Sequence, residues 1–324
     1  MAALLATPAW SDETPPVDPP PIPAAQPSPP AAGAAPAAKA GAAAVPSHQK
    51  SLAEIGAKLA DPTANIWALS FNFQGPTFYD GDVNFGSPQV GGNVIFQPVM
   101  PFPLYGEGED QWKLLTRPII PIIFSQPVPT GLDEFNGIGG LGDIQLPLML
   151  NPTHRMLGKW IFAAGPVFEF PTSTNDALGA QQYAVGPAVV VGYKTKLLTA
   201  ILFPNYFWGI GDRSDRNSST PTTSKLSLLY GLTFNLFNLP DAWQVGLNPT
   251  ISYNHKALKN NKWDVPVGIF AAKTIKLGKI PFKIQAGLEY SVVSPDLFGK
   301  RANFRFVLTP VIPGLVKNPI FGGG

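Results

Sequence analysis

The sequence predicts an all-β protein, a transmembrane antiparallel up-and-down β-barrel of about 12 strands. Residues 280–293 read IPFKIQAGLEYSVV, so apolar and polar side chains alternate along this stretch. Successive side chains of a strand point to opposite faces, which gives the stretch one apolar face and one polar face. A half-buried strand of a soluble protein alternates in the same way. The length of the stretch, above the roughly 9–11 residues of a membrane-crossing strand, and the repetition of its pattern along the chain favour a membrane barrel.

The composition agrees with this fold class. Only 14% of the 324 residues are charged and 45% are hydrophobic. No uninterrupted apolar run reaches the roughly 18 residues of a membrane-spanning helix, so the apolar residues are better explained by many strands. Cysteine is absent, which excludes disulfides and zinc–thiolate sites. The net charge of +2, without a clustered basic patch, gives no indication of nucleic-acid binding.

Four segments are predicted along the chain. Residues 1–13 resemble the end of a secretory signal whose basic start is missing, with an ordinary disordered N-terminus as the alternative. Residues 14–47 are mostly Pro, Ala and Gly, which predicts a disordered linker. Residues 48–61 are predicted to contain a short amphipathic helix, because Ser51 begins a capping-box pattern. Residues 62–324 form the predicted barrel. The helix would lie in the periplasmic mouth of the barrel or enter its lumen.

Twelve strands are predicted, an even number as bacterial barrels require. They cover residues 66–73, 92–100, 111–124, 140–150, 159–170, 182–193, 196–208, 223–235, 242–255, 262–275, 280–293 and 300–310. If the first strand starts in the periplasm, the outer loops are residues 74–91, 125–139, 171–181, 209–222, 256–261 and 294–299. The inner turns are then near residues 101–110, 151–158, 194–195, 236–241 and 276–279. The outer connections are mostly longer than the inner ones, as expected for outer-membrane barrels, although the first inner turn is too long to fit well.

Prolines inside the predicted strands conflict with a regular barrel. Each proline removes one ladder donor, and a closed barrel has no edge strand on which the loss would be harmless. Several of them follow Gly or Asn, which suggests β-bulges near a membrane interface. The prolines concerned are Pro98, Pro166, Pro187, Pro204, Pro249 and Pro266.

Large aromatic residues fall near the ends of the predicted strands. Amphipathic rings favour the membrane–water interface, so these residues predict two aromatic girdles. The alternative is that they fill the core of a soluble protein. The predicted interface aromatics are Trp112, Trp160, Tyr183, Trp208, Trp243, Trp263 and Tyr290.

The inward-facing positions carry polar and charged residues of both signs, interleaved with small residues such as Ala163, Ala184 and Ala188. Charges of both signs inside a barrel either pair and stiffen its wall or line a solute path. The small residues leave space for an open channel, a ligand or the N-terminal helix. The predicted lumen-lining residues are Arg117, Asp143, Glu169, Gln244, Asn248, Lys283, Gln285, Glu289 and Arg305.

No catalytic, metal-binding or cofactor-binding residues are predicted. His255 has Ser252 nearby, but neighbours on a strand alternate faces, so a Ser–His pair is poorly placed and an interfacial ring is favoured. The glycine-rich residues 139–143 lack the following helix that a phosphate site uses. Asp80 and Asp82 could hold calcium weakly, yet a plain turn is favoured because the later carboxylate of a calcium loop is missing.

Several stretches of the barrel resemble one bacterial family. They include GPVFEFPTSTNDALG, LFPNYFW, WQVGLNPTISYN and FRFVLTPVIP, and the resemblance runs from about residue 61 to residue 313. The chain is similar to outer-membrane barrels often labelled "neuromedin U", a misnomer, and to barrels assigned to the MetA pathway of phenol degradation. The resemblance implies an outer-membrane barrel of a Gram-negative bacterium, sometimes described as a transporter, without an agreed substrate. The Pro/Ala-rich leader lies outside it, and the chain ends in KNPIFGGG instead of a terminal aromatic residue.

Two functional classes follow. The first is a passive channel or transporter for small, hydrophobic or aromatic compounds. The second is a structural or anchoring barrel whose Pro-rich leader binds a periplasmic partner. In both, the expected partners are outer-membrane lipid, lipopolysaccharide and the barrel-assembly machinery. A small-molecule solute is expected only for the channel, and nucleic acid is expected for neither.

Overall fold

A computed structural model describes residues 47–85, 87–213, 222–236, 243–316 and 318–321. The predicted signal-like segment and the Pro/Ala-rich linker lie outside the described residues, apart from the end of the linker.

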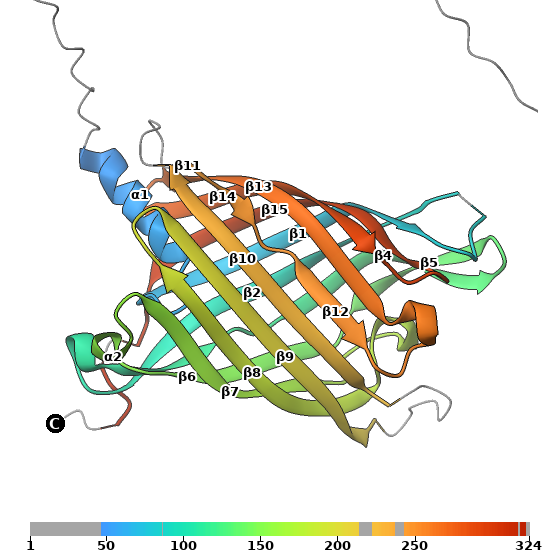
Figure 1. Ribbon diagram of the computed structural model, residues 1–324, viewed down its shortest axis with the longest axis horizontal. Helices are drawn as coiled ribbons and strands as arrows, with labels where there is room; N and C mark the ends of the chain where they lie inside the picture. The colour runs from blue at the N-terminus through green and yellow to red at the C-terminus, as the bar shows by residue number, and fades with distance from the viewer. Residues whose placement is uncertain (1–46, 86, 214–221, 237–242, 317, 322–324) are drawn as a thin grey trace, which may run out of the picture. The chain divides into compact units, whose positions relative to one another are not determined.

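One antiparallel sheet closes on itself to form a barrel (Figure 1). Strand β1 (Ile66–Asp80) pairs on one side with β2 (Gln89–Tyr105) and on the other with β15 (Gly299–Pro313), the last strand of the chain. Because both sides of β1 are paired, the sheet has no open edge at the join of its two ends. The other strands are β3 (Trp112–Thr116), β4 (Ile120–Gly131), β5 (Glu134–Leu141), β6 (Ile144–Asn151), β7 (Trp160–Phe170), β8 (Gln182–Lys194), β9 (Leu198–Asp212), β10 (Ser224–Leu236), β11 (Trp243–Leu247), β12 (Thr250–Asn254), β13 (Trp263–Leu277) and β14 (Ile280–Val293).

The 15 strand segments form 12 barrel strands. Strand β2 pairs with β3 near one end and with β4 near the other, so β3 and β4 are two parts of one strand. Segments β11 and β12 both pair with β10 and likewise continue one another. The same holds for β5 and β6, which pair with β4 and β3 respectively. The predicted closed barrel of 12 antiparallel strands is therefore confirmed.

The strand prolines coincide with interruptions of the hydrogen-bond ladder. Pro98 lies between the part of β2 that pairs with β4 and the part that pairs with β3. Pro187 lies in a short stretch of β8 that is not paired with β9, and Pro249 separates β11 from β12. A residue without an N–H loses nothing at a gap where the neighbouring strand offers no partner. Bulges were predicted at the prolines that follow Gly or Asn, but no register shift adjoins Pro166, Pro187 or Pro249. Of the six prolines named above, Pro266 alone adjoins a register shift.

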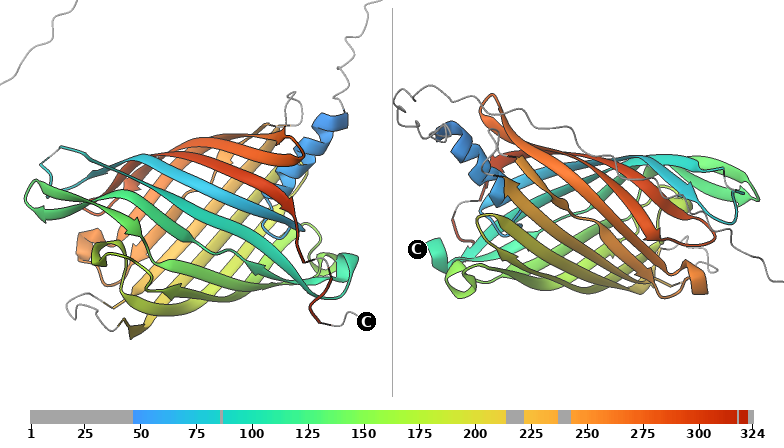
Figure 2. Two further views of the ribbon diagram at one scale, coloured as in Figure 1. Left: turned by 180° about the vertical axis from the view of Figure 1, so that it is seen from behind. Right: turned by 45° about the horizontal axis from the view of Figure 1, so that its top comes forward.

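Two predicted outer loops are largely strand. The first is shortened because β1 extends to Asp80 and β2 begins at Gln89. The second, residues 125–139, is mostly the β4–β5 hairpin, whose turn contains Leu132 and Asp133 and which projects beyond the barrel wall (Figures 1 and 2). Strand β2 also continues to Tyr105, which removes half of the first inner turn that was too long in the sequence-based assignment.

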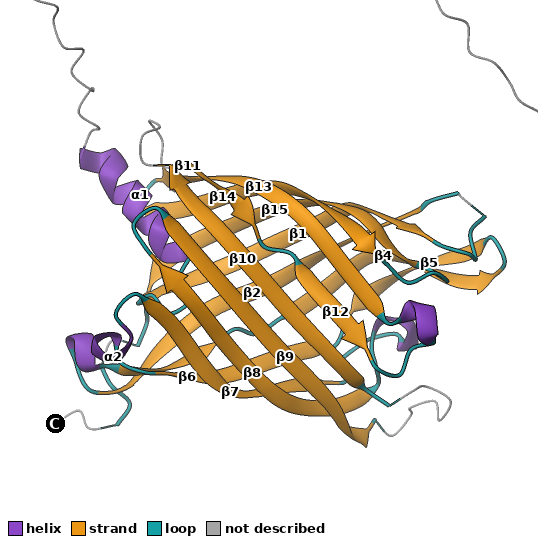
Figure 3. Ribbon diagram, viewed as in Figure 1, coloured by secondary structure: helices purple, strands orange, loops and turns teal. Residues whose placement is uncertain are grey.

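Helices are few and lie at the ends of the barrel (Figure 3). Helix α1 (Ser47–Leu59) precedes the first strand, and α2 (His154–Leu157) lies in the turn between β6 and β7. Single 3₁₀ turns occupy η1 (Gly108–Asp110), η2 (Asp176–Leu178) and η3 (Lys259–Asn261). None of the helices in the described residues is long and apolar enough to cross a membrane.

The two faces of the barrel wall differ in chemistry as the alternation predicts. On β14, Leu288 is 48% exposed on the outer face and lies between Ile269 and Phe304 of the neighbouring strands. Lys283 and Gln285 of the same strand are buried on the inner face. Exposed large apolar side chains occur on nearly every strand. A continuous apolar outer surface of this kind is typical of a lipid-facing barrel wall.

We expect Leu288→Arg to lower the free energy of unfolding by roughly 2–4 kcal/mol, the cost of a cation on the lipid face near the membrane midplane. Gln285→Arg is the matched control, because it introduces the same charge three residues earlier on the lumenal face. Its cost should be clearly smaller. Urea unfolding of each variant in lipid vesicles measures both values, and equal losses would contradict the assignment of faces on β14.

Candidate functional site

The candidate functional site is a cavity of about 400 Å³ inside the barrel. Its lining comes from residues of β1, β2, β3, β6, β8, β9, β10, β12, β13, β14 and β15, together with the segment that follows α1. Its volume lies within the roughly 300–1,000 Å³ range of small-molecule sites. The cavity therefore lies in the lumen and touches most of the wall.

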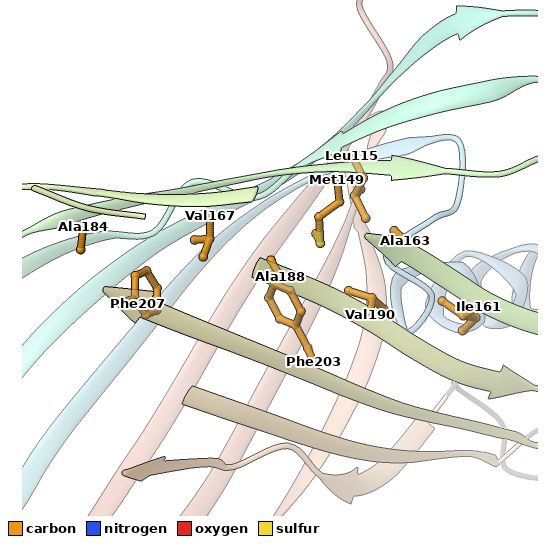
Figure 4. Packing of buried hydrophobic residues seen from close by; sticks show 10 residues of the cluster. All are labelled: Leu115, Met149, Ile161, Ala163, Val167, Ala184, Ala188, Val190, Phe203 and Phe207. Atoms are coloured by element: carbon orange, nitrogen blue, oxygen red, sulfur yellow. The ribbon is translucent and has the colours of Figure 1, made fainter. Parts of the chain in front are cut away.

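One side of the lumen is apolar (Figure 4). Ten buried side chains of β3, β6, β7, β8 and β9 pack together there, and several of them also line the cavity. We call this cluster the apolar wall; its members are Leu115, Met149, Ile161, Ala163, Val167, Ala184, Ala188, Val190, Phe203 and Phe207.

The apolar wall is the main feature that the sequence analysis missed. Ala163, Ala184 and Ala188 were expected to leave empty space in the lumen. The structure instead packs them, each no more than 2% exposed, among larger side chains such as Phe203. In residues 160–168 both faces of the strand are apolar, so alternation carries no signal that would separate an apolar lumen from the lipid face.

The opposite side of the lumen is polar and held by ion pairs. Glu289 of β14 forms an ion pair with Arg305 of β15, and the Nζ of Lys300 lies 3.8 Å from the same carboxylate. Arg305 also donates to the side-chain and backbone oxygens of Asn248, at 3.2 Å each. These contacts join β14 and β15 to the interruption between β11 and β12, and all four residues line the cavity.

Besides the exposed Lys58, two further cations in the cavity lack a carboxylate partner within the described residues. Arg117, at the break between β3 and β4, donates to the Oε1 of Gln97 at 2.9 Å, and its Cζ lies 5.7 Å from the ring centroid of Phe203. Lys283 is buried, and its Nζ lies 5.6 Å from the ring centroid of Phe270. Both rings belong to the cavity lining, so each cation has an aromatic face beside it.

The C-terminal half of α1 enters one end of the barrel (Figure 1). The side chain of Gln244 on β11 donates to the backbone oxygen of Gly56 at 3.0 Å and to the Oδ1 of Asn235 at 2.6 Å. A Cβ at position 56 would lie 2.7 Å from the Oγ1 of Thr274 on β13. Helix α1 can approach the wall this closely because residue 56 has no side chain. We call this end of the barrel the α1 end.

The segment after α1 is fixed by a second polar group. The carboxylate of Asp61 accepts from the Nζ of Lys194 at 2.5 Å and from the backbone N–H and hydroxyl of Thr63 at 2.9 and 2.6 Å. The Nζ of Lys113 donates to the backbone oxygen of Thr63 at 3.2 Å. Since Lys194 and Lys113 lie on β8 and β3, the segment is bound to the wall on the side away from Gln244.

The structure places the nine predicted lumen residues in two groups. Three of them lie outside the cavity lining. Gln244 holds α1, and Asp143 accepts backbone N–H groups of Ser173 and Ala180 at 3.1 and 2.5 Å, which fixes the loop after β7. The six that line the cavity are Arg117, Asn248, Lys283, Gln285, Glu289 and Arg305.

Glu169, the third residue outside the cavity lining, is completely buried. Its carboxylate pairs with the Nζ of Lys225 at 2.7 Å and accepts from the Nε2 of Gln145 at 2.8 Å. Glu169 lies on β7 and Lys225 on β10, which are not neighbours in the sheet. The ion pair therefore connects two separate parts of the wall through the barrel interior.

Six of the seven predicted interface aromatics are at least 36% exposed, and Trp112 is partly buried. At the α1 end, Trp160 packs edge-on against Tyr193. At the opposite end, Trp263 packs against Tyr253. Rings thus lie on the outer surface near both ends of the strands.

The other motifs form local contacts. The His255 ring packs against the rings of Tyr206 and Tyr253, at centroid distances of 5.5 and 4.5 Å. The backbone N–H of Gly81 donates to the side-chain oxygens of Asp80 and Asn84 at 2.9 and 2.8 Å, so these oxygens shape a turn. Among the described residues, no three His, Cys, Asp or Glu side chains cluster in a way that suits a metal ion.

Comparison with solved structures finds similar folds. The crystal structure of the COG4313 outer membrane channel from Pseudomonas putida F1 is similar with a TM-score of 0.51 at 16% sequence identity, over 76% of this chain and 94% of that chain. This likeness concerns the fold. A bacterial polysaccharide outer membrane secretin aligns with a TM-score of only 0.28 at 10% identity, over 76% of this chain and 98% of that chain. Neither a protein-family model nor a curated protein matches the chain.

We expect substitution of Gly56 to loosen α1. The natural chain has no cysteine, so a single Ala60→Cys variant reports how accessible the segment after α1 is to a water-soluble maleimide. Gly56→Leu should speed labelling several-fold, because the new side chain collides with Thr274. Glu54→Leu, at an exposed position of the same helix, is the control and should leave the labelling rate unchanged. Equal rates in all three proteins would contradict the close packing of α1.

Proposed function

We propose that the protein is a passive channel or transporter of the outer membrane for small compounds with apolar parts. The observation that carries this proposal is a lumenal cavity of about 400 Å³ inside a closed barrel whose outer surface is apolar. A barrel that served only as an anchor would gain from a lumen filled with packed side chains. Here packed side chains fill part of the lumen, and a cavity stays open beside them.

The proposal includes the location and its partners. The barrel lies in the outer membrane of a Gram-negative bacterium, with outer-membrane lipid and lipopolysaccharide around it and the barrel-assembly machinery as its route of insertion. The apolar outer face and the rings at both strand ends support this location. The similar fold of an outer membrane channel agrees with it. Membership of the family labelled "neuromedin U" stays a prediction from the sequence.

We assign the α1 end to the periplasm, because that orientation places the long β4–β5 hairpin outside and most short turns inside. In this orientation α1 narrows the periplasmic mouth. Its anchors, Gln244 on one side and Lys194 on the other, hold it across the opening. The anchoring alternative depends on the Pro/Ala-rich leader, which lies outside the described residues.

We expect deletion of residues 47–60 to raise the single-channel conductance of the purified protein in planar bilayers. The deletion removes α1 while Asp61 and its contacts remain. Gly56→Leu is a milder second variant and should raise conductance by a smaller amount. Retained heat-modifiability on gels confirms that each variant is folded. If the wild type and both folded variants conduct no ions, the channel proposal is wrong and the anchoring barrel is favoured.

A further inference from the structure

We propose that the lumenal cavity binds small organic anions that carry an apolar body, with Arg117 as the group that holds the carboxylate and Lys283 as a second cation in the same cavity. The proposal names a ligand class for the proposed channel and rests on that function only for the route by which the ligand enters. Binding itself is a property of the cavity. The combination that supports it is two cations without carboxylate partners beside an apolar wall in one cavity.

The charges of the cavity do not balance. Both carboxylates in the lining are already engaged, Asp61 with Lys194 and Glu289 with Arg305. A cation held in a partly buried site is costly to leave without a counter-charge, and buried charges in proteins are normally paired. The cationic lining residues are Lys58, Arg117, Lys283, Lys300 and Arg305, against the two carboxylates. An anion in the cavity would supply the missing negative charge.

Arg117 has most of its hydrogen-bonding capacity free. A guanidinium carries five N–H donors in a planar fork that suits a carboxylate. Within the described part of the chain, its one hydrogen bond is to the side-chain oxygen of Gln97. The guanidinium lies over the ring of Phe203, which belongs to the apolar wall. A carboxylate bound to Arg117 would therefore have its apolar body next to this wall.

Lys283 supplies the second cation. It has no hydrogen-bond or ion-pair partner among the described residues, although it is buried on the inner face of β14. Its ammonium group has three donors and lies beside the ring of Phe270. Its neighbours across the sheet are Thr274 and Thr309, which carry no charge. The position thus offers a positive charge with no internal competitor.

The apolar wall selects the rest of the ligand. Leu115, Met149, Val190 and Phe203 all line the cavity, so a ligand that fills it must cover apolar surface as well as meet the cations. A purely polar anion such as citrate would leave that surface in contact with water, at a cost proportional to its area. An aromatic or medium-chain monocarboxylate satisfies both sides at once.

The test uses isothermal titration calorimetry on the full chain in detergent micelles, with 3-phenylpropionate as the probe. We expect the acid to bind more tightly than the neutral 3-phenylpropanamide and than citrate. Arg117→Gln should weaken acid binding by about tenfold or more, the usual value of a hydrogen bond to a charged group. Lys283→Met removes the second cation of the cavity and should weaken acid binding by a smaller factor. Lys276→Gln removes a cation from an exposed position near the β13–β14 turn and should change nothing.

Two results would overturn the proposal. One is equal affinity for 3-phenylpropionate and 3-phenylpropanamide, which would mean that the cations contact water and not the carboxylate. The other is unchanged acid binding in both folded cation variants. Measuring the conductance of the same preparations distinguishes failure of the anion-site proposal from failure of the channel proposal. Current without acid binding rejects the anion site and leaves the channel intact, whereas binding to a barrel that never conducts supports the site and rejects the channel.

Discussion

The structure depends on closure of the backbone hydrogen-bond ladder between the first and last strands. Strand β1 pairs with β15 over almost its whole length, and this contact turns a twelve-strand sheet into a barrel without edges. In a membrane every unpaired backbone group costs several kcal/mol, so closure is what allows the outer face to be apolar. The ladder still has gaps, and the prolines mark them. At Pro98, Pro187 and Pro249 the residue that cannot donate lies at an interruption of the ladder. The barrel can therefore break its strands locally while it stays closed.

Closure also creates a lumen that must be filled with side chains or with water. The two sides of this lumen differ in the side chains that they present. From β6 to β9 small and large apolar side chains interlock, whereas β14 and β15 present ion pairs and amides. Helix α1 enters at the boundary between these sides. Its approach requires the absence of a side chain at Gly56, and its fixation requires polar partners at two separate points of the wall, Gln244 and Lys194. A single short helix without those partners would have little to hold it in the mouth of the barrel.

Alternation predicted the fold because lipid on one face and a polar lumen on the other impose a period of two on strands such as β14. On β14 the structure buries Lys283 and Gln285, two of the residues that alternation assigned to the inner face. It failed on β7, where Ile161 and Phe162 face opposite sides yet are both apolar. Ion pairs that cross the lumen could not be predicted from the sequence for a different reason. The ion pair of Glu169 with Lys225 joins strands separated by two others, and no local spacing encodes such a contact.

The apolar and the polar side of the lumen determine different properties of the cavity. The apolar wall excludes water from part of the cross-section and so fixes the shape of what fits. The polar side sets the charge. Among the residues that the structure describes, the carboxylates in the cavity lining are those of Asp61 and Glu289, and Glu289 is paired with Arg305. What remains is an excess of positive charge in a narrow space where the surrounding protein and lipid weaken screening. In the proposed channel this field would act on every solute that passes the cavity, whichever end the solute enters from. It would oppose cations and would retain an anion longest beside Arg117 or Lys283, where an aromatic ring adjoins the cation.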